Sequence, residues 1–229
     1  MKRTLVILTL NEIEGVRVLV PRLSRDAADE IIAVDGGSVD GTREFLAANG
    51  IRICDQQRRG RGEAFRVAVR EGAGDIFVFF SPDGNEDPLD IPKLFAALEA
   101  GADMAIASRF LPEARNEEDD QTWPLRKWAN QGFTRIANLL WNRGRPVITD
   151  TINGFRGIRR SVFEAIQPVS MGYTIEYELT IQAMRRGLRI VEIPTVEHSR
   201  CGGETKAPSW RTGWVFLRFL IGQLTSGGR

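Results

Sequence analysis

The chain has 229 residues, of which 42% are hydrophobic, and its 31 Lys and Arg nearly balance its 30 Asp and Glu, for a formal net charge of +1. This predicts a soluble globular protein with a sizeable core, in one large domain or two closely joined ones. The balanced charge gives no reason to expect a nucleic-acid partner, and two cysteines without paired spacing argue against a disulfide framework or a zinc site.

The first half of the chain alternates apolar runs with segments of helical periodicity. The apolar runs predict strands over residues 4–10, 30–34, 51–54, 75–80 and 102–107, and helices are expected after residue 16 and over 42–49, 64–71 and 89–100. Such alternation predicts βαβ units, and therefore a mostly parallel sheet covered by helices on both faces.

Polar motifs follow these strands. Asn11-Glu12, Asp35, Arg61 and Asp83 each come after a predicted strand. The carboxyl ends of parallel strands meet at one edge of the sheet, where open α/β sheets bind ligands, so we expect these residues to converge there.

The turn after the 77–80 strand carries three carboxylates, in the sequence Ser81-Pro82-Asp83-Gly84-Asn85-Glu86-Asp87-Pro88. Hard oxygen ligands at a strand end suit a Mg²⁺ or Mn²⁺ ion that grips a phosphate. The alternative is a solvated acidic turn without a ligand.

The second half is less regular. It predicts a polar loop over 112–121, a long helix over 123–141, an extended segment over 149–158, a helix over 175–186, a strand over 188–196 and a basic loop over 199–208. Pro194 indicates either that the last strand lies at a sheet edge or that the strand ends near this residue.

The C-terminal stretch 210–224 is too short and too interrupted by arginine to cross a bilayer. Its apolar residues fall at helical spacing and form one face: Trp210, Trp214, Leu217, Ile221 and Leu224. A helix of this kind either lies on a membrane surface or docks on the core or on a second subunit. The last alternative would make the protein a homodimer.

Taken together, the motifs resemble the family-2 glycosyltransferases of GT-A fold, and within them the dolichol- and polyprenyl-phosphate sugar transferases. The likeness spans about residues 4–206. It rests on the order of these motifs: Thr9-Leu10-Asn11-Glu12, Asp35-Gly36-Gly37-Ser38-Val39-Asp40-Gly41-Thr42, Gly60-Arg61-Gly62, the turn at Asp83, Ser108-Arg109, Trp123 to Arg126, Asp150, Gly154-Phe155-Arg156, Glu176, Glu192-Ile193-Pro194 and Arg200 to Lys206.

Two positions depart from the family pattern. Gly36 stands where the second Asp of the nucleotide loop is usual, and Ser81 stands where the metal turn usually begins with Asp. The resemblance therefore implies a metal held by Asp83, with Asn85 as a neutral ligand, together with diphosphate oxygens and water.

The fold implied is a Rossmann-like GT-A domain. Residues 1–110 would form its nucleotide-sugar-binding half, 111–208 its smaller acceptor-binding half and 209–229 a C-terminal amphipathic helix. The nucleotide-sugar contacts implied are Thr9, Asn11, Glu12, Asp35, Gly60, Arg61, Gly62 and Ser81.

The implied reaction is inverting transfer of a sugar from a UDP- or GDP-sugar, with Asp83 and its cation stabilising the departing diphosphate. Four basic residues favour a lipid phosphate as acceptor: Arg109, Arg126, Arg200 and Lys206. A hydroxyl acceptor would instead need a general base, for which Asp150 and Glu176 are the candidates, unless each forms an ion pair with a neighbouring Arg.

Two other functions stay open on the sequence. One is a soluble glycosyltransferase with a hydroxyl acceptor, and the other is a non-catalytic nucleotide-sugar binder, which the changes at Gly36 and Ser81 would allow. We expect a cytoplasmic protein, either free or peripheral on the inner face of the membrane.

Overall fold

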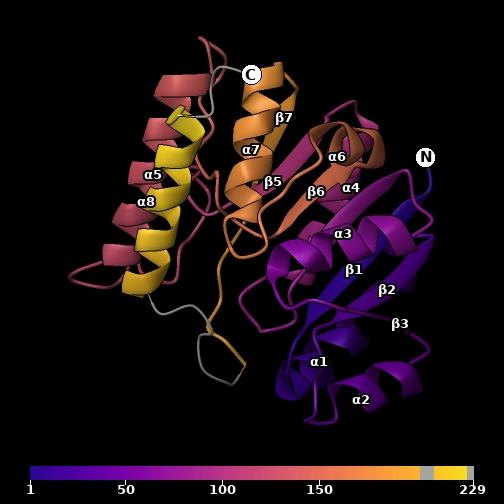
Figure 1. Cartoon of the computed structure of the whole chain (residues 1–229). Helices are drawn as coiled ribbons and strands as arrows, with labels where there is room; N and C mark the ends of the chain where they lie inside the picture. The colour runs from indigo at the N-terminus through magenta and orange to yellow at the C-terminus, as the bar shows by residue number, and fades with distance from the viewer. Residues whose placement is uncertain (202–208, 226–229) are drawn as a thin grey trace.

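The computed structural model describes residues 1–201 and 209–225 (Figure 1). Its strands are β1 (Arg3–Thr9), β2 (Glu30–Asp35), β3 (Arg52–Asp55), β4 (Ile76–Phe80), β5 (Met104–Ser108), β6 (Arg156–Arg159) and β7 (Ile190–Pro194). Its α-helices are α1 (Ile13–Leu19), α2 (Thr42–Ala48), α3 (Arg61–Glu71), α4 (Ile91–Glu99), α5 (Leu125–Trp141), α6 (Arg160–Ile166), α7 (Ile175–Arg186) and α8 (Ser209–Thr225). Short 3₁₀ turns are Val20–Arg22, Arg25–Ala27 and Pro88–Asp90.

The strands form one sheet in the order β3-β2-β1-β4-β6-β5-β7. All neighbouring pairs are parallel except those of β6, which runs antiparallel to both β4 and β5. The mostly parallel GT-A sheet predicted from the sequence is therefore confirmed, and β7, which ends at Pro194, lies at the edge as expected. The extended segment predicted over 149–158 is wrong in its bounds, because only Arg156–Arg159 pairs as a strand and α6 follows at once.

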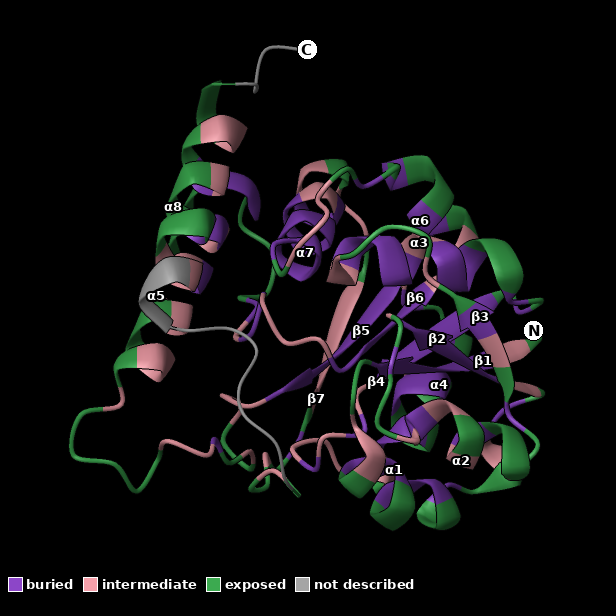
Figure 2. Cartoon of the chain, turned by 60° about the horizontal axis from the view of Figure 1, so that its bottom comes forward, coloured by how far each residue is buried: buried purple, intermediate pink, exposed green. Residues whose placement is uncertain are grey.

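Both faces of the sheet are covered. Side chains alternate along β4, so that Phe77 and Phe79 face one cluster while Val78 and Phe80 face the other. The first cluster packs under α3, α5, α6 and α7, and the second under α1, α2 and α4. Figure 2 shows the central strands as a buried layer between helices that are exposed on their outer sides, whereas the edge strand β7 is only partly buried.

Helices α5, α7 and α8 form a group beside the sheet (Figure 1). Phe216 of α8 contacts Phe133 of α5, with ring centroids 5.5 Å apart, and Tyr177 of α7, at 5.8 Å. Phe216 and Leu220 are buried in the core. The C-terminal helix therefore docks on the core through one side. None of the helices in the described ranges is long and apolar enough to span a membrane.

Candidate active site

A first cavity of about 360 Å³ lies at the carboxyl ends of the central strands. Its lining residues are Leu8, Thr9, Leu10, Glu12, Val34, Gln56, Gly60, Arg61, Ala64, Ser81, Asp83, Gly172, Tyr173 and Arg200. The parallel strands thus bring Glu12, Arg61 and Asp83 to one cavity, whereas Asn11 and Asp35, which the sequence placed with them, do not line it.

Asp35 orders the loop beside this cavity. Its carboxylate accepts hydrogen bonds from the Thr9 and Ser38 hydroxyls, at 2.9 and 2.6 Å, and pairs with Arg43 at 3.0 Å. Burial alone would raise the pKa of Asp35, but hydrogen bonds from Ser38, Arg43 and Thr9 outweigh it and hold this pKa below its usual value. Asn11, with a φ of 52°, accepts the Val39 N–H at 2.9 Å and so ties the first loop to the second.

The Gly60-Arg61-Gly62 loop turns into α3 against the 170–171 backbone. The Gly62 N–H donates to the Met171 carbonyl at 2.9 Å, and a Cβ at Gly62 would lie 1.9 Å from the Ser170 carbonyl oxygen. Both glycines are thus required by close backbone packing, and Arg61 is the residue of this loop that reaches the site with a side chain.

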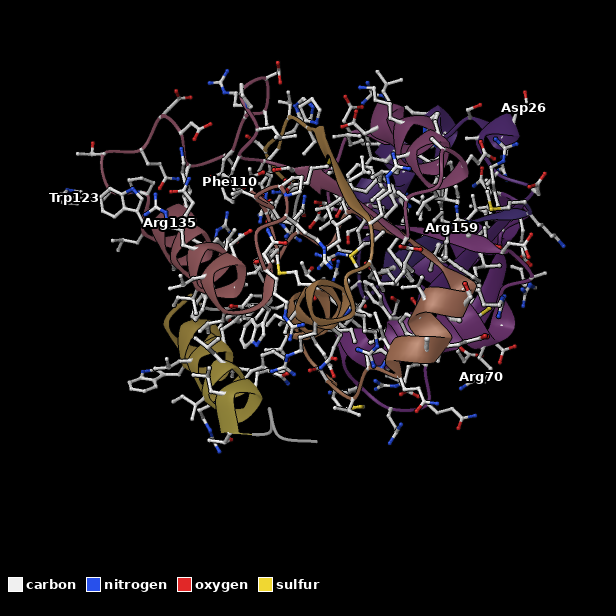
Figure 3. All side chains as sticks on the ribbon, turned by 90° about the horizontal axis from the view of Figure 1, so that it is seen from above. Asp26, Arg70, Phe110, Trp123, Arg135 and Arg159 are labelled. Carbon is white, nitrogen blue, oxygen red and sulfur yellow. The ribbon has the colours of Figure 1, made fainter. Side chains whose placement is uncertain are left out.

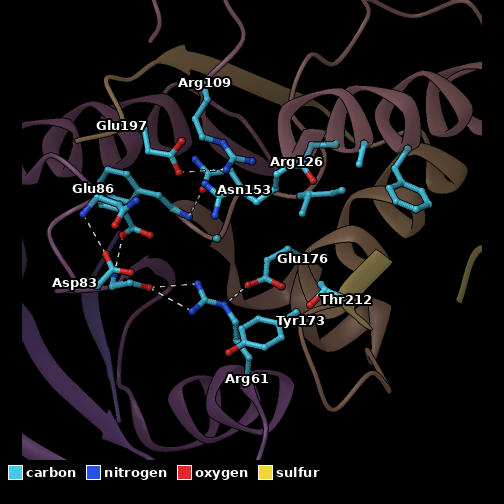
Figure 4. A pocket seen from close by; sticks show the side chains of 18 of the residues that line it. Arg61, Asp83, Glu86, Arg109, Arg126, Asn153, Tyr173, Glu176, Glu197 and Thr212 are labelled. Atoms are coloured by element: carbon cyan, nitrogen blue, oxygen red, sulfur yellow. Dashed lines mark hydrogen bonds and ion pairs between the residues drawn. The ribbon is translucent and has the colours of Figure 1, made fainter. Parts of the chain in front are cut away.

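A second cavity of about 480 Å³ adjoins the first. Arg61, Ser81, Asp83, Tyr173 and Arg200 line both cavities. The second is lined by both charged and apolar side chains. The charged side chains are Arg61, Asp83, Glu86, Arg109, Arg126, Glu176, Glu197 and Arg200, and the apolar ones are Leu125, Ala129, Phe133, Ile152, Phe155 and Phe216 (Figure 4).

Arg109 and Asp150 form a two-pronged buried ion pair. Arg109 Nε lies 2.7 Å from Asp150 Oδ2, and Nη2 lies 3.1 Å from Oδ1. Burial alone would lower the pKa of Arg109, but the charges of Asp150 and Glu197 outweigh it and raise this pKa. Asp150 is fully buried and also accepts N–H groups of Ile152 and Asn153. Arg109 lines the cavity whereas Asp150 lies behind it, so the structure puts Asp150 in position to orient Arg109.

Arg61 and Glu176 form the second ion pair. Both side chains line the cavity (Figure 4). Arg61 also contacts the Ser81 hydroxyl with two nitrogens, each at 3.3 Å. Gly154 leaves room for this arrangement, because a Cβ there would lie 2.0 Å from Arg61 Nη2. Both candidate general bases are therefore paired with arginine, but only Glu176 lines the cavity.

The Asp83 turn offers oxygen ligands for a divalent cation. Asn85 donates its side-chain amide to Glu117 Oε2 at 2.9 Å, which leaves Asn85 Oδ1 buried and without a hydrogen-bond partner. A buried unpartnered oxygen beside a carboxylate fits a metal ligand. Asp83 Oδ2 lies 2.9 Å from Arg200 Nη1, which already brings one positive charge to the turn.

The remaining acceptor-side residues are placed as follows. Arg126, at the start of α5, pairs with Glu117 and with Glu118 at 3.4 Å, and it lines the second cavity. Lys206 lies outside the described residues. Sequence reasoning missed Glu197, which accepts from Arg109 at 3.4 Å and from Asn116 at 2.5 Å. It also missed Tyr173 between the two cavities; neither residue belongs to a motif that would have marked it.

The sheet order and its carboxyl-edge cavities belong to a fold that matches solved GT-A glycosyltransferases. The model of glycosyl transferase family 2 matches residues 4–167, and the chain belongs to this family. Polyprenol monophosphomannose synthase of Mycolicibacterium smegmatis is 33% identical over 90% of the chain and 81% of its own length.

Two further similarities extend this finding. Dolichol-phosphate mannosyltransferase of Pyrococcus furiosus is 28% identical over 96% of the chain, and the chain covers only 63% of that relative. Glucosyl-3-phosphoglycerate synthase of Mycobacterium tuberculosis, solved with Mn²⁺, uridine diphosphate and glucosyl-3-phosphoglycerate, has a TM-score of 0.73 and 25% identity. That match covers 98% of this chain and 79% of the other.

Proposed function

We propose that the chain transfers a sugar from a UDP- or GDP-sugar to the phosphate of a polyprenyl or dolichyl phosphate, with inversion at the anomeric carbon and with Mg²⁺ or Mn²⁺ as cofactor. The observation that carries this proposal is the composition of the second cavity. Four arginines line it, Arg61, Arg109, Arg126 and Arg200, and aromatic and aliphatic side chains, among them residues of α5 and α8, line the same cavity. A phosphate joined to a hydrocarbon chain has the matching polarity.

In this proposal the donor occupies the first cavity. Thr9, Glu12 and the loop ordered by Asp35 border the nucleoside, and Arg61, Ser81 and Asp83 border the diphosphate at the boundary between the cavities. A divalent ion bound at Asp83 and Asn85 would supply positive charge to the diphosphate as it leaves.

The acceptor phosphate would lie among Arg61, Arg109 and Arg126. One of its oxygens forms the bond to the anomeric carbon, while the bond from that carbon to the diphosphate breaks and its electron pair leaves with the diphosphate. A phosphate monoester is already anionic, so this step needs no general base. The pairing of Asp150 with Arg109 and of Glu176 with Arg61 supports this reading, because each carboxylate holds an arginine in place.

A phosphorylated hydroxyl acceptor is a second candidate. Glu176 lines the same cavity as the arginines, so it could accept a proton from a hydroxyl if Arg61 turned toward an acceptor phosphate. The structurally similar glucosyl-3-phosphoglycerate synthase was solved with glucosyl-3-phosphoglycerate, a phosphorylated compound, which motivates 3-phosphoglycerate as a test acceptor.

In the experiment, the protein is incubated with a labelled donor, which is UDP-glucose, UDP-galactose or GDP-mannose, and with Mg²⁺ or Mn²⁺. The acceptor is undecaprenyl phosphate, dolichyl phosphate or 3-phosphoglycerate. We expect label in the organic extract with a lipid phosphate. Label only in the aqueous product with 3-phosphoglycerate would favour the second candidate, and binding of nucleotide sugars without transfer or hydrolysis would favour a binding protein.

We extend the proposal to a peripheral position on the cytoplasmic face of an anionic membrane. Helices α5 and α8 lie side by side and expose large apolar side chains on their outer surfaces: Leu125, Trp128, Ile136, Leu139, Leu140, Trp214, Val215, Leu217, Ile221 and Leu224. Neither helix contains Asp or Glu, whereas the whole chain is nearly balanced in charge. Figure 3 shows Trp123 and Arg135 directed outward on this side. Apolar and basic side chains together suit an anionic lipid surface, and the second cavity lies between the same helices.

A further inference from the structure

The Asp83 turn folds back on its own start. Gly84 has a φ of +102°, a conformation that favours glycine, and the chain reverses there. As a result Glu86 returns to Ser81, and its Oε2 accepts the Ser81 N–H at 2.7 Å. The carboxylate of Glu86 therefore lies next to the position at which the family usually has an aspartate.

Glu86 also faces the site. It lines the second cavity together with Ser81, Asp83 and Asn85, and Figure 4 shows it beside Asp83. Within the described residues, no ion pair involves Glu86, although most other buried carboxylates of the site are paired with arginine. In this part of the chain, Glu86 therefore presents a carboxylate without an arginine partner to the same cavity as Asp83 and Asn85.

Asn85 supplies an independent observation. Its backbone N–H donates to Asp83 Oδ1 at 3.1 Å, and its side-chain NH₂ faces the Glu117 carboxylate, which can only accept. This fixes the orientation of the amide. Asn85 Oδ1 is buried with no hydrogen-bond partner, and in the sequence Asn85 stands between Asp83 and Glu86. An amide oxygen without a donor fits a divalent cation, which takes oxygen ligands of this kind.

We propose that Glu86 supplies the carboxylate that position 81 lacks, so that Asp83, Asn85 and Glu86 together hold the divalent ion. The inference rests on the proposed function only in assigning the ion to a nucleotide diphosphate. Ser81 is then not a metal ligand, and its hydroxyl accepts hydrogen bonds from the guanidinium of Arg61. The loss of one family aspartate is in this way a relocation of a ligand from residue 81 to residue 86, and the number of carboxylates at the ion is retained.

The test is direct binding of Mn²⁺, measured by electron paramagnetic resonance of the free ion, with UDP and in a separate series with GDP. The variants are Glu86→Gln and, as matched control, Asp87→Asn. Glutamine keeps an oxygen that can accept from the Ser81 N–H, so the turn should persist. Asp87 is the adjacent carboxylate; it caps the Leu89 N–H at 3.0 Å, a role that asparagine also performs, and it does not line the cavity. Thermal unfolding confirms that each variant is folded.

We expect Glu86→Gln to weaken Mn²⁺ binding at least ~10-fold in the presence of the nucleotide, because affinity follows the number of charged oxygen ligands, and Asp87→Asn to remain within about twofold of the wild type. Equal Mn²⁺ affinity of Glu86→Gln and the wild type would overturn the inference, as would a wild type that binds no Mn²⁺. If the wild type binds Mn²⁺ and this binding depends on Glu86, but no sugar is transferred, the result would count against the proposed function alone.

Discussion

The guanidinium of Arg200 lies 2.9 Å from the carboxylate of Asp83, and the two residues line both cavities. The backbone reinforces this contact, because the Cys201 N–H donates to the Asp83 carbonyl at 2.8 Å and the His198 N–H to that of Asn85 at 3.0 Å. The segment after β7 is thus tied to the turn after β4, although more than 100 residues separate them in the sequence. In the proposed reaction, Arg200 and the ion at Asp83 would both contact the diphosphate.

Replacing Arg200 by Gln should therefore lower the rate of transfer while leaving the fold intact. Removing one donor to developing charge typically costs a factor of ~10²–10³ in kcat. Steady-state kinetics with the accepted donor measures this effect, and Arg143→Gln, an exposed arginine outside both cavities, serves as control. Unchanged kcat in Arg200→Gln would show that the contact with Asp83 is structural only.

Asp150→Asn should destabilise the protein by about 3–5 kcal/mol, because it removes the charge that pairs with buried Arg109 at two points and leaves Arg109 with the longer contact to Glu197, at 3.4 Å. Urea unfolding measures the free energy. The matched control is Asp120→Asn, which breaks a pair with Arg115 whose side chains are 82% and 60% exposed; such a surface pair contributes about 0–1 kcal/mol. Equal losses in the two variants would contradict the assignment of Asp150 as the residue that holds Arg109.

Gly154→Ala should reduce activity with little effect on stability. The added Cβ would lie 2.0 Å from the end of the flexible Arg61 side chain, which can move away but then leaves its place beside Glu176 and Ser81. Gly132→Ala in α5 is the control, because nothing lies within 4 Å of its Cβ, and alanine in a helix interior should stabilise by about 0.5–1 kcal/mol. Kinetics and thermal unfolding together test the pair; full activity of Gly154→Ala would mean that the position of Arg61 is unimportant.

Asp35 gives a prediction on pH. Its pKa in the folded protein is held below the unfolded value of about 3.9, so it stabilises the fold at higher pH, and this contribution is lost as pH falls through the folded pKa. Asp35→Asn should cost about 1–3 kcal/mol at pH 7, since an amide cannot accept from all of the donors. The difference from the wild type should shrink below about pH 4. A difference that stays constant between pH 7 and pH 3 would rule out this ionised role.

The membrane proposal predicts that Leu139→Glu combined with Ile221→Glu abolishes flotation with vesicles that contain anionic lipid. Both side chains are exposed on the α5–α8 surface, so the substitutions should leave the fold stable. Leu89→Glu, at an apolar residue that is 73% exposed elsewhere, is the control and should float like the wild type. The alternative is that this face contacts a second subunit. Light scattering without lipid measures the oligomeric state, and a wild-type dimer that dissociates in the double variant would support this alternative.

The sequence predicted the helices and strands of the first half of the chain well, because apolar runs and helical periodicity are local signals. It did not predict β6 as a short antiparallel strand, since the 149–158 segment owes its path to contacts with distant residues such as Glu192 and Arg109. Motif order located the site residues at strand ends. The sequence could not predict which of these residues form ion pairs. Arg109 with Asp150 and Arg61 with Glu176 are far apart in the sequence and come into contact only in the folded chain. Glu86 was visible as a carboxylate, but only the reversal at Gly84 brings it back to Ser81.

In the proposed reaction, a phosphate held by arginines is the nucleophile. The most direct measurement compares undecaprenyl phosphate with undecaprenol as acceptor for the wild type, with the preferred labelled nucleotide sugar and Mn²⁺, and determines the anomeric configuration of the lipid product. We expect product with the phosphate only, with the configuration inverted from that of the donor. Transfer to undecaprenol at a comparable rate, or a product that retains the donor configuration, would contradict this expectation.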